Sequence, residues 1–254
     1  MCLGRIGRRE LGREVAMDWL RRILDRGAPA RSSQAPRRVF DLLGAAERDT
    51  IVANIVDERL SLLGLTRLGP RTWIDGSAPP TRRMFQLQLL KGASLKTTWG
   101  YSLDFVPHLS GGGLRWHRTD KSAMLDVIVD PKDLPALSYS YGAAQWVSDL
   151  ERALPLAIDR ACETWRRGST WRGMLDIVQD MRSRQSNGLA FDNYTQLPLT
   201  LVLLSAKVGD LPAADAELEC LVRQRGLSDE VAAKLAALTR NLANSRGEEG
   251  GRPT

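Results

Sequence analysis

The stretch from Leu114 to Ala123, LRWHRTDKSA, gathers side chains that can do chemistry at neutral pH. It contains His117, one of only two histidines in the chain, and an imidazole titrates close to neutrality. The neighbouring Arg115 or Arg118 could hold a carboxylate or a phosphate, and Asp120 could orient the imidazole. These residue types predict a site for proton transfer on a small acidic substrate.

The alternation of a β-strand would decide which of these side chains act together. If the stretch is a strand, Arg115, His117 and Thr119 share one face and Trp116 lies on the other, where it can enter the core. The competing interpretation is an exposed sheet edge, because edges commonly carry charged residues that block pairing with other chains. On that interpretation His117 is simply solvated.

The second histidine, His108, precedes the glycine turn Gly111–Gly113. A hairpin around this turn would let His108 approach His117 across the strand pair. Asp104 or Asp126 could add an acidic ligand, but no spacing in the sequence demands a metal, and we predict none.

A second candidate for binding is the segment TWRRGSTWRG, in which aromatic and basic residues interleave. Such interleaving can bind single-stranded nucleic acid. It can equally join two helices, with arginines at the end of the first helix, where the helix dipole favours cations. The candidate binding residues are Trp165, Arg166, Arg167, Trp171 and Arg172.

The net positive charge of the chain comes from its first 38 residues. Residues 1–38 contain ten arginines and four acids, a net charge of +6, and the whole chain carries 36 − 30 = +6. The remainder is therefore balanced, so the electrostatic argument for nucleic acid applies to the N-terminal arm alone. The first residues also leave open whether translation starts at Met1 or at Met17.

Three widely spaced cysteines provide neither a disulfide framework nor a zinc site. No apolar run is long enough to cross a bilayer, and no secretory leader is recognisable. A reducing cytoplasm fits these features best. The sequence contains no nucleotide-binding glycine loop and no nucleophile elbow, so we expect no cofactor.

Helical and extended patterns alternate in blocks along the chain. Short segments rich in aromatic and β-branched residues lie between helical patterns, and predict an α+β fold with a mainly antiparallel sheet of four to five strands. Helices pack on this sheet, and an all-helical segment follows it. The expected parts are a basic arm and linker (1–38), an α+β domain (39–168), a helical region (169–243) and a disordered tail (244–254).

The layout of residues 45–168 resembles the bacterial family catalogued as domain of unknown function 4304. The resemblance rests on an opening helix that ends in LLGLTRLG, a strand around Trp73, the segments FQLQLLKG and WGYSLDF, and a closing helix with LERALP. It covers roughly half of the chain. The resemblance implies an α+β fold, and since some members lie near toxin–immunity systems it also implies an immunity-like role, but it assigns no catalytic residue.

Three functions follow from these observations. The leading hypothesis is a non-enzymatic, cytosolic protein-interaction domain, because no reaction-specific constellation is present and Trp and Arg often anchor interfaces. The second is an enzyme that acts on a small acidic substrate through His117, Arg115 and Asp120. The third is nucleic-acid binding through the basic arm and the segment TWRRGSTWRG. The oligomeric state does not follow from the sequence.

Overall fold

The computed structural model describes residues 44–76, 80–90, 94–129, 134, 137–138, 143–184 and 196–245. The basic arm, with its second possible start at Met17, and nearly all of the C-terminal tail lie outside the described residues. Predictions that concern those segments therefore stay predictions.

The main sheet is antiparallel and confirms the predicted α+β fold. Its strands follow the order β1-β2-β3-β4-β7, and a further short strand, β8, pairs with β4. The bounds are β1 Thr66–Gly69, β2 Thr72–Ile74, β3 Thr81–Leu90, β4 Ser94–Leu103, β7 Val127–Val129 and β8 Leu137–Ser138. The long central pair, β3 and β4, runs in register from Thr81 opposite Leu103 to Leu90 opposite Ser94.

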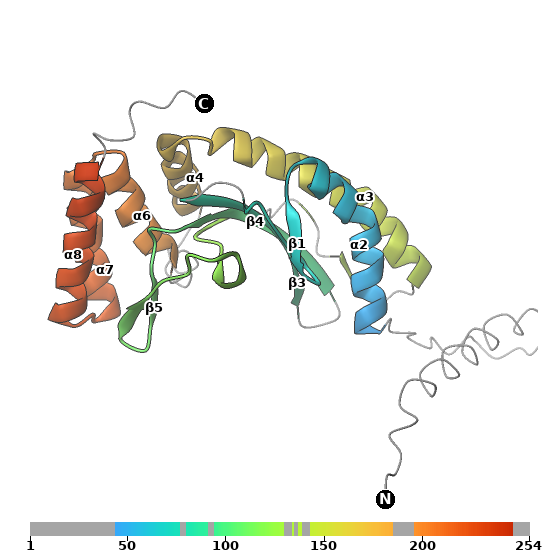
Figure 1. The fold of residues 1–254 in the computed structure, drawn as a ribbon, viewed down its shortest axis with the longest axis horizontal. Helices are drawn as coiled ribbons and strands as arrows, with labels where there is room; N and C mark the ends of the chain where they lie inside the picture. The colour runs from blue at the N-terminus through green and yellow to red at the C-terminus, as the bar shows by residue number, and fades with distance from the viewer. Residues whose placement is uncertain are drawn as a thin grey trace, which may run out of the picture. The chain divides into compact units, whose positions relative to one another are not determined.

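Two helices pack on one face of this sheet, as Figure 1 shows for α2 (Ala45–Leu62) and α3 (Ala143–Arg167). The apolar stripe of α3 recurs every three or four residues and is buried: Trp146, Leu150, Leu154, Ile158, Ala161 and Trp165. Three hydrogen bonds fix α3 to β4: from Trp99 Nε1 to Thr164 Oγ1 (2.9 Å), from the Tyr101 hydroxyl to the Trp165 carbonyl (2.7 Å), and from Trp165 Nε1 to the Gly100 carbonyl (3.1 Å).

Proline inside the α3 pattern predicts a kink or a split helix, yet α3 is a single element from Ala143 to Arg167 that includes Pro155. The carbonyl that loses its intrahelical donor is that of Glu151, four residues earlier. Because Glu151 is exposed, water can satisfy that carbonyl, and the helix need not break.

The C-terminal helices share one hydrophobic core with the sheet. They are α4 (Trp171–Ser183), α6 (Gln196–Lys207), α7 (Leu211–Arg225) and α8 (Asp229–Asn244). Every side chain of α6 is buried, and α6 contacts α4, α7, α8 and β7. The helical region expected over residues 169–243 therefore contributes to the same hydrophobic core as the sheet.

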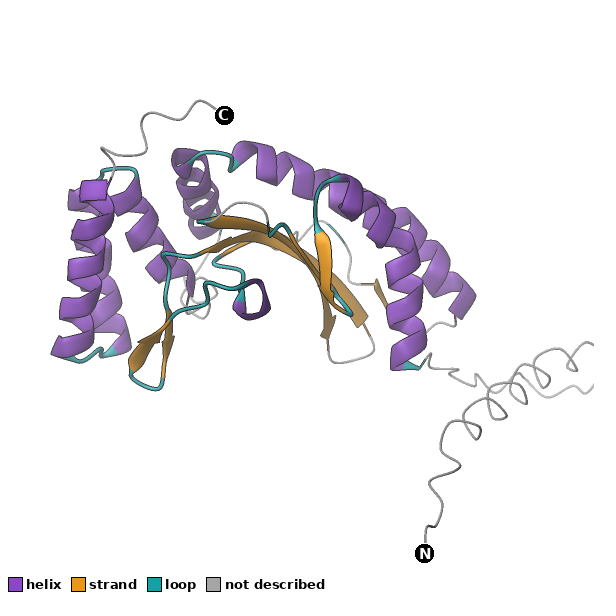
Figure 2. Cartoon of the chain, in the orientation of Figure 1, coloured by secondary structure: helices purple, strands orange, loops and turns teal. Residues whose placement is uncertain are grey.

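A small hairpin and an irregular segment lie between β4 and β7. The hairpin pairs β5 (His108–Ser110) with β6 (Gly113–Arg115) around the predicted glycine turn. Residues 116–126, which we call the strap, then lead to β7 and contain one short 3-10 helix, Asp120–Ser122 (Figure 2). Strap residues Ala123 and Leu125 pack on Ile74 and Met84, which places the strap on the face of the sheet opposite to Phe85 and α3.

Candidate functional site

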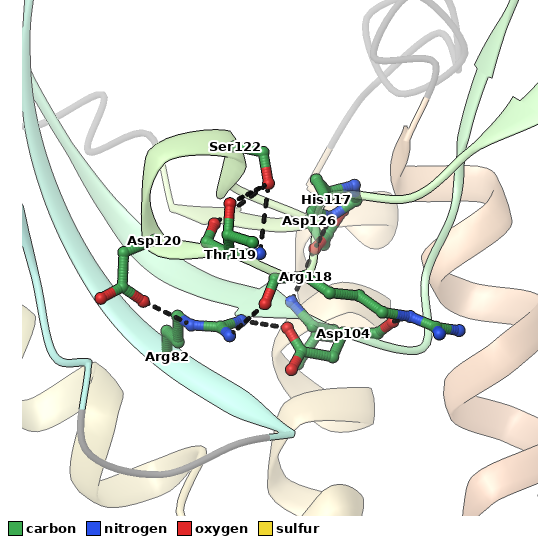
Figure 3. A network of polar contacts seen from close by, with 9 residues as sticks. Arg82, Asp104, His117, Arg118, Thr119, Asp120, Ser122 and Asp126 are labelled. Carbon is green, nitrogen blue, oxygen red and sulfur yellow. Dashed lines mark hydrogen bonds and ion pairs between the residues drawn. The ribbon is translucent and has the colours of Figure 1, made fainter.

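A network of polar contacts pins the strap to the sheet at the place where the sequence predicts a site (Figure 3). Its centre is Arg82 on β3, whose side chain is only 5% exposed. The guanidinium forms an ion pair with Asp104, donates from Nε to Asp120 Oδ1 (2.9 Å), and donates from a terminal nitrogen to the Arg118 carbonyl (2.6 Å). Arg82 therefore joins β3, the end of β4 and the strap.

The strap also forms its own turn next to this contact. Thr119 and Ser122 exchange hydrogen bonds through their side chains and backbone, which closes the single turn of 3-10 helix. Asp120 opens the turn and reaches Arg82. The carboxylate that the sequence predicts as the partner of His117 is thus bound to an arginine, and that prediction is wrong.

The partner of His117 is Asp126, at the far end of the strap. His117 Nε2 lies 2.9 Å from Asp126 Oδ2, and the same oxygen accepts a hydrogen bond from the backbone N–H of Leu103 (2.7 Å). His117 is 4% exposed and Asp126 is fully buried. The prediction of a strand with Trp116 in the core is also wrong, because β6 ends at Arg115 and the chain then turns the imidazole inward and the indole outward.

Two polar atoms of this pair, His117 Nδ1 and Asp126 Oδ1, are buried and have no hydrogen-bond partner among the residues that the structure describes. Burial raises the pKa of the Asp126 carboxyl to about 6, against the opposing effect of the hydrogen bonds from His117 and Leu103. A substrate could reach the pair only by displacing the strap, since neither side chain opens to solvent.

We expect the stability that Asp126 contributes to decrease as the pH rises. The folded chain raises the carboxyl pKa from 3.8 to about 6, so between these values the folded state keeps a proton that the unfolded state has released. The contribution is complete below pH 3.8 and is lost as the pH rises through 6. The full change is at most about 3 kcal/mol.

The measurement is the difference in unfolding free energy between the parent chain and Asp126→Asn, taken by urea denaturation from pH 4 to pH 7. An asparagine cannot ionise, so the parent should lose stability relative to the variant across this range. A difference that stays constant with pH would contradict the raised pKa.

The other two members of the predicted cluster lie apart from this pair. The hairpin register places Arg115 opposite His108, so His117 lies two residues beyond the last strand pair. His108 Nδ1 is hydrogen-bonded to the amide of Gln196 on α6, and Arg115 is exposed. The predicted pairing of two histidines across the hairpin is therefore replaced by separate partners, and no group of three metal-ligating side chains occurs among the described residues.

The segment TWRRGSTWRG joins α3 to α4. This is the helix junction that the sequence offered as the alternative to nucleic-acid binding. Trp165 is buried and donates from Nε1 to the Gly100 carbonyl (3.1 Å), while Trp171 packs edge-on against Phe105. Arg167 pairs with Asp180 (2.6 Å) and Arg172 with Asp176 (3.8 Å); Arg166 lies in the last turn of α3. A nucleobase could not stack on Trp165 without opening the core.

The aromatic side chain of the strap, Trp116, faces outward and is 42% exposed. It borders a groove of about 450 Å³ between the β5–β6 hairpin and α8, which we call the Trp116 groove. The groove is lined by Gly112, Gly113, Leu114, Trp116, Glu230, Val231, Lys234 and Leu238. Sequence reasoning missed both this groove and Arg82. The signal for Arg82 was a pair of adjacent arginines, Arg82 and Arg83, in an alternating strand, of which one must face each side of the sheet.

Comparison with protein-family models, with curated proteins and with solved structures finds no match to this chain. The resemblance to domain of unknown function 4304 therefore stays a prediction. Among the residues that the structure describes, no helix has both the length and the apolar character needed to cross a membrane.

Proposed function

We propose that this chain is a non-enzymatic protein-interaction domain whose contact surface is the Trp116 groove. The observation that carries the proposal is that the strap turns its polar side chains toward partners within the chain and its tryptophan toward solvent. Its chemically active side chains, His117, Asp120 and Asp126, are bound internally, whereas its large aromatic side chain, Trp116, is turned outward beside a groove. Exposed tryptophan and arginine are the residues that most often dominate protein interfaces.

The surroundings of Trp116 suit a binding role. Arg118 stacks on the indole, with its guanidinium carbon 4.0 Å from the ring centroid. Leu114, Val231 and Leu238 supply an apolar lining, and the strap beneath is held by Arg82. A rigid aromatic anchor costs little conformational entropy when it binds, so the arrangement favours tight contact with a partner.

The cellular setting of this proposal is the cytoplasm. Cys162 and Cys220, the cysteines among the described residues, are both free thiols, which fits a reducing compartment. An immunity-like role, implied by the family resemblance, is the more specific form of the proposal. Catalysis through His117 is the alternative, and it requires the strap to open.

The proposal predicts that Trp116→Ala weakens binding of the natural partner by at least about 30-fold, the loss typical of an interface hot spot. A photo-crosslinking residue placed at the exposed position 115 of the full chain, which leaves Trp116 in place, would first identify the partner in extracts of the source organism. The purified partner would then be titrated calorimetrically against the parent and the variant.

The matched control is Leu156→Ala on α3, because Leu156 is 46% exposed and lies outside the groove. This control should bind the partner as the parent does. If both variants bind with parental affinity, the groove is not the contact surface. If the parent binds no protein and turns over a small acid in a manner that His117→Gln abolishes, the enzymatic alternative replaces the proposal.

A further inference from the structure

On and beside the strap, the acidic side chains have partners within the chain, whereas several basic side chains have no carboxylate partner among the described residues. Among the described residues, no carboxylate pairs with Arg115, Arg118 or Lys121, all of which are exposed. The acids of the same segment are already bound, since Asp120 is held by Arg82 and Asp126 is buried against His117. The strap therefore presents a surface with an excess of positive charge.

The groove itself adds no free negative charge. Its one lining acid, Glu230, forms an ion pair with Lys234 one turn along α8 (2.6 Å). The remaining walls are aliphatic or glycine, apart from the indole of Trp116. A largely apolar groove whose indole carries the guanidinium of Arg118 complements a ligand that combines an apolar group with a carboxylate.

Arg118 is prepared to bind such a carboxylate. Its Nε donates to the Asp104 carbonyl (3.2 Å) while the guanidinium face lies on Trp116, and these two contacts fix the plane of the fork. Its two terminal nitrogens have no partner among the described residues. A planar guanidinium held in this way can donate two parallel hydrogen bonds to one carboxylate with little loss of entropy.

We infer that the Trp116 groove binds an acidic peptide segment of a protein partner, with one bulky apolar side chain in the groove and a carboxylate on Arg118. The inference rests on the proposed function and specifies the chemistry of the partner. A nucleic acid would also bring negative charge. A base needs an open aromatic face on which to stack, however, and Arg118 covers a face of Trp116.

The test is selection of a displayed library of random peptides, about 16 residues long, on the immobilised full chain. We expect enriched peptides to carry Asp or Glu close to a bulky apolar residue. Fluorescence anisotropy with one enriched peptide should show binding at least about tenfold weaker for Trp116→Ala, which loses the apolar contact, and for Arg118→Glu, which loses the charged hydrogen bonds to the carboxylate.

Two controls isolate the charge. Arg152→Gln removes a solvent-exposed arginine on α3 and should leave binding unchanged. The same peptide with its acids replaced by the corresponding amides should bind the parent at least about tenfold more weakly, and a peptide with lysine in place of the critical acid should regain affinity for Arg118→Glu.

The outcomes separate this inference from the proposed function. Neutral or basic peptides that bind in a Trp116-dependent manner would overturn the acidic partner but keep the groove as an interaction surface. Displacement of the acidic peptide by oligothymidine, with the same dependence on Trp116, would overturn a protein partner. If no peptide depends on Trp116, the inference is wrong, and the crosslinking experiment, which uses no peptide, still decides whether the groove binds a protein.

Discussion

Replacing Arg82 with glutamine is expected to lower the free energy of unfolding by about 3 kcal/mol. The substitution removes a buried cation that bonds Asp104, Asp120 and the Arg118 carbonyl at once. Asp104, with a side chain that is only 16% exposed, would be left without its ion-pair partner in a site that water enters poorly. The loss of stability reflects that uncompensated charge more than the loss of attraction.

Urea denaturation of the parent and Arg82→Gln would measure this effect, and the midpoint should fall clearly for the variant. The control is Arg152→Gln, because Arg152 pairs with Asp149 on the surface of α3 and its side chain is 73% exposed. That control should change stability by less than about 1 kcal/mol. Adding Asp104→Asn to Arg82→Gln should restore part of the lost stability. If Arg82→Gln is as stable as the control Arg152→Gln, Arg82 has no structural role.

The strap also connects this prediction to binding. Arg82 holds the carbonyl of Arg118, and Arg118 is the residue that stacks on Trp116. If the strap loosens in Arg82→Gln, hydrogen exchange of the backbone amides at 116–126 should accelerate more than that of β3 and β4. Under conditions in which the variant stays folded, its affinity for the partner should fall as well, since the indole is no longer preorganised.

Local periodicity predicted the sheet because each strand carries its own signal. In the segment from Met84 to Leu89, the side chains of Phe85, Leu87 and Leu89 alternate with those of Met84, Gln86 and Gln88, and this alternation predicts a strand with one buried and one solvent-facing side. Phe85 and Leu87 are buried, whereas Leu89 is 39% exposed. The same alternation predicted a wet opposite face, which the structure shows only at the far end of β3. Gln88 is exposed there, whereas Met84 is covered by the strap.

The candidate site could not be predicted in the same way, because its contacts join residues far apart in sequence. Arg82 reaches Asp104, Arg118 and Asp120, which follow it by 22, 36 and 38 residues. His117 turns inward toward Asp126, nine residues on, in a segment that has no regular period. Sequence reasoning identified the stretch that holds the site but reversed the roles of Trp116 and His117, since a strand was expected to continue past Arg115.

A larger loss, of at least about 4 kcal/mol, is expected for Gly100→Ala. Gly100 lies on β4 opposite Ile128 of β7. A methyl group there would lie 1.7 Å from the carbonyl oxygen of Val127, far inside any possible contact, and the backbone adopts a φ of +153°. The Val127 carbonyl cannot move aside easily, because it is part of the backbone of β7 and not the end of a flexible side chain.

The consequence would reach the candidate site. β7 follows directly from Asp126, whose backbone N–H donates to the Tyr101 carbonyl (2.8 Å) and whose carboxylate accepts from Leu103. If β7 is pushed away from β4, Asp126 loses these two hydrogen bonds, and His117 loses the carboxylate that holds it in the interior. Gly100 thus permits the close strand pairing on which the orientation of Trp116 also depends.

Thermal and urea unfolding of Gly100→Ala would test this, with Gly69→Ala as the matched control on a strand. Gly69 has no neighbouring atom within 4 Å of an added methyl group, so its substitution should change stability by less than about 1 kcal/mol. A Gly100→Ala variant that unfolds at the temperature of the parent would show that β7 does not pack against β4 as described. The difference in unfolding free energy between Gly100→Ala and Gly69→Ala reports the cost of separating β7 from β4. That strand pairing is what lets His117 face inward and Trp116 outward.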